Sequence, residues 1–391
     1  MKKVLLGSFI SIISLILLAN EPIMLNKNEK PLVKSVETVL ELPPSDNNPR
    51  NSEGAFITLK DGTIMYAFSR YHGGSWDDNA PSDIAARYSY DGGKTWTKED
   101  KILFKCGTKK GDNLMSVSLL RLQNGEIAIV YLQKFVEPCG RINCMPKIRF
   151  SKDECKTWSE VVDCIPYSAR GYYVVNNDRV IQLKNGRLLV PTCYAKQLPK
   201  GVAHRYTDYV YYSDDNGRTW KESEWLLPST HKTRTGLQEP GLIELQNGNV
   251  MLFARTDLKY QYKSFSADKG ETWSAPVQAT EFPSPVAPLS IKRNPADNSL
   301  IAVWCGKQSG WNFPKPAKKT WGRTPLVMAV SYDDGNTWEK HTAIETDHTN
   351  GFCYTAIHFT DDNSMLLAYC CGGKNLVPLQ AVRIKKFKLN K

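Results

Sequence analysis

The chain has 391 residues, of which 41% are hydrophobic, 23% charged and 10% aromatic. This composition excludes a disordered or low-complexity chain and predicts a folded protein. The formal net charge is +11, but two lysines at the start and a basic run at the end leave a net of only about four over the body. No array of basic and aromatic residues accompanies this charge, so we expect no nucleic-acid partner.

Residues 1–19 (MKKVLLGSFISIISLILLA) combine two lysines with an uncharged apolar run. This arrangement is typical of a secretory signal peptide. Ala19 lacks a small residue two positions before it that would complete a cleavage site, so an uncleaved anchor is the alternative. Because no second apolar run follows, we expect an exported protein that is secreted, periplasmic or at the cell surface, with no stable membrane span in its mature domain.

Ten cysteines are compatible with an oxidising compartment. Cys139 with Cys144, and Cys155 with Cys164, are close enough in sequence for disulfides, although spacing does not fix the connectivity. We expect a few bonds and several buried thiols. The cysteines follow no zinc pattern, and motifs such as H-E-x-x-H and G-x-x-x-x-G-K-[ST] do not occur, so the sequence predicts neither a metal nor an organic cofactor.

One phrase with the template S-x-D-x-G-x-T-W recurs five times along the chain. The copies begin at Ser89, Ser151, Ser213, Ser266 and Ser331, and their tryptophans are 62, 62, 53 and 65 residues apart. The aspartate and serine can satisfy the backbone groups of a turn, the glycine takes a left-handed conformation, and the tryptophan packs between sheets. Cys155 replaces the glycine in the second copy, so we expect a distorted turn there.

A second phrase, a turn followed by an apolar strand, occurs six times with the same period. Its turn residues are Gly62, Gly125, Gly186, Gly248, Asn298 and Asn363. Asp-Gly and Asn-Gly between apolar runs favour β-hairpins, and small sheets that cannot bury their own faces favour stacking around an axis. We predict an all-β fold, a six-bladed β-propeller over residues 31–391, whose ring is closed by the N-terminal strand 31–42.

Polar residues recur at one offset in these repeats. Nine residues before the turn residues lie Glu53, Ser116, Asn177, Glu239, Leu289 and Tyr354. Equivalent positions of a propeller lie at a similar height on the axis, so we expect Glu53, Asn177, Glu239 and Tyr354 to surround a ligand pocket. A hydrated tunnel with polar walls is the alternative.

The five phrases, known as Asp boxes, resemble those of the sialidase (neuraminidase) superfamily over roughly residues 31–391. The resemblance implies that Tyr354 is the nucleophile and Glu239 the base that activates it. A neutral phenol can approach an anomeric carbon that carries a carboxylate, and sialidases are the exception to the use of two carboxylates by retaining glycosidases. The resemblance also implies that Arg255 and Arg323 bind the sugar carboxylate.

The acid/base in this family is an aspartate on a loop of the first repeat, which here implies Asp78 or its neighbour Asp77. Arg70, at the end of the strand before this loop, and Gln238, beside Glu239, are further substrate-binding candidates. A solvated loop is the alternative for the two acids.

The chain departs from the family where the first arginine of the triad is expected. Ser52 and Glu53 occupy that place, and Cys370 occupies the place of the supporting acid. A glutamate there weakens carboxylate binding unless another base compensates, or accepts hydrogen bonds from hydroxyls of a different acidic sugar. The candidate bases, which spacing alone does not place, are Arg50, Arg170, Arg179, Lys292 and Arg293.

We therefore predict an exported exo-glycosidase that removes a terminal sialic acid or related acidic sugar by a retaining mechanism. Its expected partners are sialylated or otherwise acidic glycans, and the sequence carries no signal for an oligomeric state. A propeller that uses the same pocket as a non-catalytic glycan receptor is the alternative, although a receptor does not need Tyr354, Glu239 and a loop aspartate together.

Overall fold

The computed structural model describes residues 23–24, 32–107, 111–198, 201–224 and 232–390. The predicted signal segment 1–19 lies outside these residues. The described chain consists of β-strands with two short 3₁₀ helices, η1 (Tyr167–Ala169) and η2 (Lys318–Thr320), which confirms the all-β prediction. In this part of the chain, no helix is both long enough and apolar enough to cross a membrane.

The repeats fold into antiparallel groups of strands in chain order. The first sheet contains β3 (Asn51–Thr58), β4 (Ile64–Tyr71), β5 (Ser82–Ser89) and β6 (Lys101–Phe104). The nine strands of the second are β7 (Asn113–Arg121), β8 (Ile127–Val136), β9 (Ile142–Ser151), β10 (Val162–Asp163), β11 (Tyr172–Val174), β12 (Ile181–Gln182), β13 (Leu188–Gln197), β14 (Val202–Ser213) and β15 (Lys221–Glu222). The nine-stranded sheet spans two repeats, which meet where β9 and β11 pair in parallel at Cys144 and Tyr172.

Three further sheets complete the described fold. One contains β16 (Gln238–Glu244), β17 (Val250–Arg255), β18 (Tyr260–Ser266) and β19 (Val277–Pro283). The next contains β20 (Ser290–Arg293), β21 (Leu300–Cys305), β22 (Leu326–Ser331), β23 (Glu339–Glu345) and β1 (Ile23–Met24). The last contains β24 (Asn350–Thr360), β25 (Ser364–Gly373), β26 (Ala381–Leu389) and β2 (Val33–Leu42).

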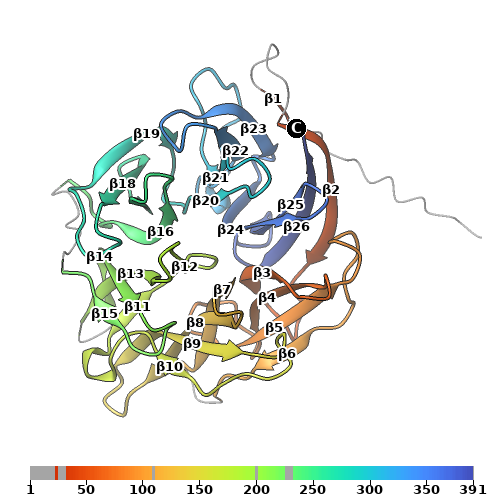
Figure 1. Cartoon of the computed structure of the whole chain (residues 1–391). Coiled ribbons are helices and arrows are strands. Elements are labelled where there is room, and N and C mark those ends of the chain that lie inside the picture. The colour runs from red at the N-terminus through yellow and green to blue at the C-terminus, as the bar shows by residue number, and fades with distance from the viewer. Residues whose placement is uncertain (1–22, 25–31, 108–110, 199–200, 225–231, 391) are drawn as a thin grey trace, which may run out of the picture.

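The first long strand pairs with the last strand of the chain. β2 runs antiparallel to β26, from Val33 opposite Leu389 to Leu42 opposite Val382, and Figure 1 shows β2 (red) beside β26 (blue). The sheets are arranged around a common centre (Figure 1). This pairing brings the predicted N-terminal strand onto the last repeat, whereas the number of blades and a complete ring stay predictions.

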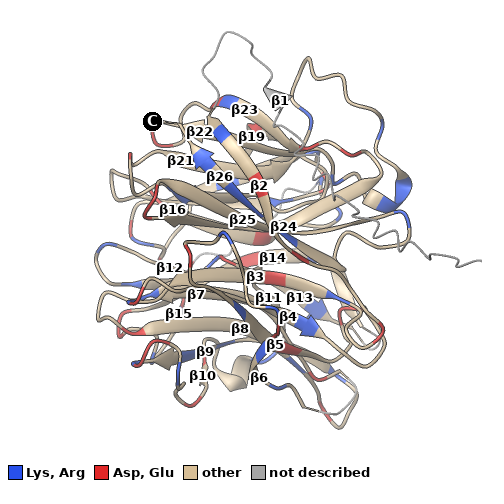
Figure 2. Ribbon diagram, turned by 90° about the vertical axis from the view of Figure 1, so that its right-hand side faces the viewer, with Lys and Arg blue, Asp and Glu red and all other residues tan. Residues whose placement is uncertain are grey.

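Acids from neighbouring segments pair with the basic run at the end of the chain. Arg383 and Lys385 both pair with the buried Glu345, and Lys386 and Lys388 pair with Asp362. Figure 2 shows basic and acidic residues interspersed along the strands and loops. The high positive charge of the sequence therefore does not gather on these strands as an unpaired patch.

The tryptophans of the Asp boxes join the hydrophobic cores between neighbouring sheets. Trp96 packs on a cluster formed by β3, β4 and the last sheet, and Trp158 on one shared by the first and second sheets. The other three join the remaining interfaces: Trp220, Trp273 and Trp338. Each box therefore ties a turn of one repeat to its core, as its composition predicts.

The turns of the boxes are held by a repeated set of hydrogen bonds. In the first, Ser89 Oγ accepts from the Gly93 N–H at 2.8 Å and donates to Asp91 at 2.9 Å.

The second box was expected to be distorted, and that prediction is wrong. Cys155 takes the left-handed conformation with φ of 64° and donates its N–H to Ser151 at 2.8 Å, so the glycine's role needs only a positive φ that a buried cysteine can adopt.

The expected disulfides are absent. All ten cysteines lie in the described part of the chain, and all are free. Cys139 lies on an exposed loop whereas Cys144 is buried within β9, and Cys155 and Cys164 pack into different core clusters. Proximity in sequence does not bring these sulfur atoms together because one cysteine of the first pair is exposed and the other buried, and the cysteines of the second pair join different clusters.

Removal of one buried box hydroxyl should lower stability measurably. In Ser213→Ala the Gly217 N–H, which donates to Ser213 Oγ at 2.8 Å, is left buried without a partner, so we expect a loss of about 1–3 kcal/mol in the free energy of unfolding. Denaturant unfolding measures it. Ser168→Ala, at an exposed position, is the control; equal stability of the two variants would contradict the structural role of the box.

Candidate functional site

Four inner strands carry a bulge with one non-glycine residue in the left-handed region. These residues are Glu53 (φ 52°), Ser116 (φ 59°), Glu239 (φ 51°) and Tyr354 (φ 55°). At each one the register between the inner strand and its neighbour shifts by one residue. A bulge redirects a side chain that would otherwise follow the alternation of the strand. All four side chains line the same cavity.

This central cavity has a volume of about 130 Å³. Its wall combines the four bulge residues with polar and aromatic side chains from the first, second and third sheets. These additional residues include Asp78, Lys134, Tyr172, Asn176, Tyr206 and Arg255. The cavity therefore brings together carboxylates, cations and a phenol from segments far apart in the sequence.

The phenol of Tyr354 and the carboxylate of Glu239 are in direct contact. Tyr354 Oη donates a hydrogen bond to Glu239 Oε1 at 3.1 Å, and both residues are buried. Burial, and secondarily the charge of Glu239, raises the pKa of Tyr354 well above its ordinary value. The phenol stays protonated at neutral pH, so it can act as a nucleophile only if a base such as Glu239 takes its proton.

Two arginines flank this pair. Arg255 Nη2 lies 3.0 Å from Glu239 Oε1, and the Arg323 guanidinium carbon lies 5.6 Å from the centre of the Tyr354 ring. Both arginines donate to the Val286 carbonyl, at 3.5 and 3.1 Å. Within the described residues, Arg255 Nε and Arg323 Nε and Nη1 are buried without a hydrogen-bond partner, so N–H groups remain for an anion.

A third arginine, Arg50, lies directly beside the cavity. Its fully buried guanidinium is 2.5 Å from Asp78, 3.6 Å from Glu53 and 4.4 Å from the centre of the Tyr71 ring. Among the five bases proposed to compensate for the altered triad, Arg50 is the one that contacts two residues of the cavity wall. Arg50 directly precedes β3, and this position brings its side chain to the cavity wall. The spacing of the repeats alone does not predict that contact.

The other four proposed bases do not line the cavity. Arg170 pairs with Glu137, Lys292 with Asp178 and Arg293 with Asp334. Arg179 is buried behind the wall, 5.5 Å from the centre of the Phe253 ring. Burial lowers the pKa of Arg179 to about 10, while Glu239 favours its charged form. Arg179 thus adds a buried positive charge near Glu239 without contacting the cavity.

The two positions that depart from the family pattern touch each other. Ser52 Oγ lies 3.5 Å from Cys370 Sγ, and the Glu53 N–H donates to the same sulfur at 3.4 Å. A neutral Ser–Cys contact therefore occupies the places that the resemblance gives to an arginine and its supporting acid. Replacement of both partners together avoids the cost of one buried unpaired charge.

Asp78 and Glu53 have opposite protonation tendencies although they share one cavity. Desolvation opposes the ionisation of Asp78, but Arg50 and Lys134 outweigh it and lower the pKa of Asp78 to about 2. Burial raises the pKa of Glu53 to about 7, against the opposing effect of Arg50. Near neutral pH, Asp78 is therefore a carboxylate, whereas Glu53 is partly protonated. Two carboxyl groups with pKa values this far apart are typical of an acid and a base that act together.

Two sequence-predicted residues of the first repeat lie away from the cavity. Arg70 Nε donates to Asp100 at 2.9 Å; its neighbour Ser69 accepts from the Ser116 N–H, so the alternation of β4 turns Arg70 to the other face. Asp77 is exposed and accepts from the Asn79 N–H at 2.9 Å. Arg70 therefore belongs to an ion pair, and Asp77 shapes the loop that presents Asp78.

Two more predicted residues are buried near the site without lining the cavity. Asn177 donates to the carbonyls of Gly54 and Tyr354 at 2.8 and 3.3 Å, and Asn176 lines the cavity instead. In the third repeat the left-handed residue is Asp178, one position closer to the turn than Asn177, whereas the cavity-lining Asn176 is one position farther from it. The offset of nine therefore selects neither of the two. Gln238 pairs with Arg255 across β16 and β17 and does not line the cavity.

Lys134 is a residue of the cavity wall that sequence reasoning missed. It is buried in β8, and its Nζ donates to the Asp78 carbonyl at 2.6 Å. The signal that could have identified it is a lysine within the apolar strand IAIVYLQKFV. A lysine buried in such a strand needs a partner, and here the loop backbone supplies one.

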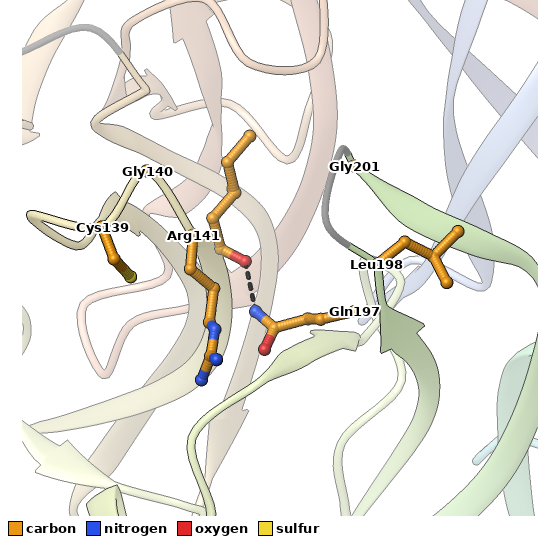
Figure 3. A pocket seen from close by; sticks show the side chains of 7 residues that line it. Cys139, Gly140, Arg141, Gln197, Leu198 and Gly201 are labelled. Atoms are coloured by element: carbon orange, nitrogen blue, oxygen red, sulfur yellow. Dashed lines mark hydrogen bonds between the residues drawn. The ribbon is translucent and has the colours of Figure 1, made fainter.

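A larger cavity, of about 560 Å³, lies elsewhere (Figure 3). It is lined by residues 139–142 on one side and by Gln197, Leu198 and Gly201 on the other. Gln197 Nε2 donates to the Ile142 carbonyl at 2.7 Å across it. Among its described lining residues the only charged side chain is Arg141, so this cavity lacks the acid and base found at the centre.

Comparison with known proteins shows the family to which the chain belongs. The model of the BNR repeat-like domain family matches residues 54–367. A sialidase of Bacteroides fragilis is 21% identical over an alignment of 363 residues, and the match covers 87% of this chain and 63% of that protein. The chain therefore spans less than two-thirds of the length of this curated relative.

Solved structures agree on the fold. A protein of unknown function from Dyadobacter fermentans superposes with a TM-score of 0.69 at 20% identity, over 91% of this chain and 99% of that one. A leech intramolecular trans-sialidase complexed with 2,7-anhydro-Neu5Ac superposes with a TM-score of 0.65 at 16% identity, over 90% and 70% of the two chains. Because the family model covers most of the chain, and named relatives are sialidases, the chain belongs to the BNR repeat-like domain family within the sialidase superfamily.

Proposed function

We propose that this chain is an exported glycosidase that releases a terminal sialic acid or a related acidic sugar from glycans by a retaining mechanism. The observation that carries the proposal is the 3.1 Å hydrogen bond from Tyr354 Oη to Glu239, within a cavity flanked by arginine N–H groups that lack partners. A six-bladed ring closed by β2 is the scaffold we propose for it, and export rests on the composition of residues 1–19.

Tyr354 acts as the nucleophile in this proposal. Glu239 takes the phenolic proton as Tyr354 Oη forms a bond to the anomeric carbon, and the bond from that carbon to the departing oxygen breaks. Water then attacks the same carbon and gives one proton to the carboxylate left by the acid that protonated the departing oxygen. The bond to Tyr354 breaks, and the phenol recovers its proton from Glu239. Two displacements at one carbon retain its configuration.

The departing oxygen needs a proton, and two carboxyl groups are candidates for the donor. Glu53 is the better candidate in the free protein because its pKa of about 7 leaves much of it protonated at neutral pH, whereas Arg50 keeps Asp78 ionised. Asp78 then acts as a base or holds Arg50 in place. The assignment implied by the family, with Asp78 as acid, is the alternative.

The charge around the cavity favours an anionic sugar. Four basic side chains lie in or near its wall: Arg50, Lys134, Arg255 and Arg323. Arg50 pairs with the Asp78 carboxylate and Arg255 with Glu239, whereas Lys134 donates to the Asp78 carbonyl. An anion near Arg255 and Arg323 would satisfy buried N–H groups that otherwise stay unpaired.

The size of the cavity implies that the ligand extends beyond it. A volume of about 130 Å³ is below the range of about 300–1,000 Å³ that is usual for small-molecule sites. A second cavity of about 460 Å³ includes Arg323, Val286, Trp321 and Lys259 in its wall. Since Val286 accepts from both Arg255 and Arg323, we propose that the two cavities together hold the sugar acid and part of its aglycone.

Substitution of the nucleophile separates an enzyme from a receptor. Tyr354→Phe keeps the ring and removes only the hydroxyl, so turnover of sialosides should fall by at least about 10³-fold while binding of the sugar acid changes little. Release of free sugar from a panel of sialosides, uronides and neutral glycosides measures activity and substrate class together. If the wild-type protein binds a member of the panel but releases sugar from none, it is a glycan receptor and the proposed enzymatic activity is wrong.

Leaving-group dependence identifies the acid. Glu53→Gln should reduce kcat/KM by about 10²-fold or more for natural glycans with poor leaving groups, and much less for activated aryl glycosides. Wild-type activity on natural glycans should decline above about pH 7, where Glu53 loses its proton, and Glu53→Gln should lack that step. Asp78→Asn is the matched variant; if it alone shows the leaving-group dependence, Asp78 is the acid.

Arginine substitution tests recognition of the carboxylate. Arg323→Ala should weaken binding of a sugar acid by at least about 10-fold relative to the matching neutral sugar, because a charge-assisted contact is lost. Isothermal titration of both sugars measures the ratio. Arg293→Ala, which removes a guanidinium paired with Asp334, is the control. Equal losses for the acid and the neutral sugar in Arg323→Ala would argue against carboxylate binding there.

A further inference from the structure

Three side chains of the first sheet form a cluster outside the central cavity. His72 follows β4, Asp83 lies on β5 and Cys106 follows β6. His72 Nε2 lies 3.4 Å from Asp83 Oδ1 and 3.6 Å from Cys106 Sγ, and the three ligand atoms all lie within 4.8 Å of one another. None of the three residues lines the central cavity, so the proposed reaction does not account for them.

The spacing of these atoms matches the edges of a tetrahedral metal site. With Zn–N of about 2.05 Å, Zn–O of about 2.05 Å and Zn–S of about 2.3 Å, tetrahedral angles place N and O about 3.4 Å apart and N and S about 3.6 Å apart. Both calculated edges agree with the distances of His72 to Asp83 and to Cys106. We propose that His72, Asp83 and Cys106 bind one zinc-type divalent cation.

Without a cation, hydrogen bonds hold only the cysteine of the cluster: Cys106 Sγ lies within hydrogen-bond distance of His72 Nε2, at 3.6 Å, and donates to the Gly107 carbonyl at 3.1 Å. The His72–Asp83 separation of 3.4 Å is longer than the usual N–H···O range, which ends at about 3.2 Å. Asp83 Oδ1 instead accepts the Cys106 N–H at 2.9 Å, a contact of the kind that orients metal-ligating carboxylates. Imidazole, carboxylate and thiolate are all zinc ligands. The chain therefore positions three such donors around one point.

Acidic surroundings add to the attraction for a cation. Asp112 lies against the same segment, since a Cβ atom on Gly107 would approach its Oδ2 to 2.0 Å. Gly107 directly follows Cys106 in the chain. With three protein ligands from this cluster, the fourth tetrahedral position is left for water or for another nearby oxygen donor.

The metal would fix the base of the loop that carries Asp78. The backbone N–H of His72 donates to the Pro81 carbonyl at 2.9 Å, and this hydrogen bond closes the loop 72–81. Asp83 follows the loop on β5. A cation held by His72, Asp83 and Cys106 would clamp the two ends of this loop to the segment after β6. We assign it a structural role, because its ligands lie outside the cavity wall.

Metal binding by the full chain tests the site without any assay of activity. After chelator treatment and dialysis, wild type should bind about one equivalent of Zn²⁺ with a dissociation constant below about 1 μM. Co²⁺ should give the intense near-ultraviolet absorption of a thiolate–cobalt bond. His72→Ala and Cys106→Ser should each weaken binding by about 100-fold or more. Cys139→Ser, which removes an exposed cysteine outside the cluster, is the control.

Clear outcomes would overturn the proposal. Failure of wild type to bind Zn²⁺ below about 100 μM, or Co²⁺ binding without the thiolate absorption, contradicts the site even if the variants do not fold. Unchanged affinity in folded Cys106→Ser also contradicts it. Circular dichroism shows whether each variant is folded. Because none of these measurements involves sugar release, they fail or succeed independently of the proposed glycosidase activity.

Discussion

The site depends on a backbone constraint, the left-handed residue that interrupts each of four inner strands. A non-glycine residue in this conformation costs about 1–3 kcal/mol, so it persists only where the surrounding structure enforces it. Here the strained residues are Glu53, Ser116, Glu239 and Tyr354, and all of them face one cavity. In a regular strand, Glu239 and Tyr354 would follow the ordinary alternation of faces. Their hydrogen bond, which joins positions 115 residues apart, therefore requires both bulges at once.

The second constraint is the burial of positive charge. Arg50 and Arg255 are paired with carboxylates of the cavity wall. In the described part of the chain, these two arginines as well as Arg323 and Arg179 each retain at least one buried N–H group without a partner. Unsatisfied buried donors are costly, and natural proteins keep few of them. A bound carboxylate would satisfy donors of Arg323 and offset the repulsion between neighbouring guanidinium groups. The positive groups Arg50 and Lys134 also lower the pKa of Asp78, so positive charge influences the protonation of the site.

The sequence revealed the repeat and three residues of the cavity wall because both follow from periodic features. The Asp boxes and turns have a fixed spacing, and the offset of nine finds Glu53, Glu239 and Tyr354 because their bulges lie at one distance from the turn. The offset fails at Asn177, since the left-handed residue of that repeat is Asp178. It also cannot locate Arg50, which reaches the wall from outside the strand by packing over Tyr71. The cluster of His72, Asp83 and Cys106 has no sequence motif because three separate segments supply its donors.

The loop 72–81 connects these features. Arg50 donates to the Asp78 carboxylate, and Lys134 donates to the Asp78 carbonyl. At the base of the loop, the backbone N–H of His72 donates to the Pro81 carbonyl. In the family pattern an arginine would occupy the place of Ser52, but here Ser52 meets Cys370 and the guanidinium of Arg50 binds the loop instead. An anion that draws Arg50 away from Asp78 removes a charge that keeps the pKa of this carboxyl at about 2. The pKa of Asp78 then rises, so the protonation of the loop depends on what Arg50 binds.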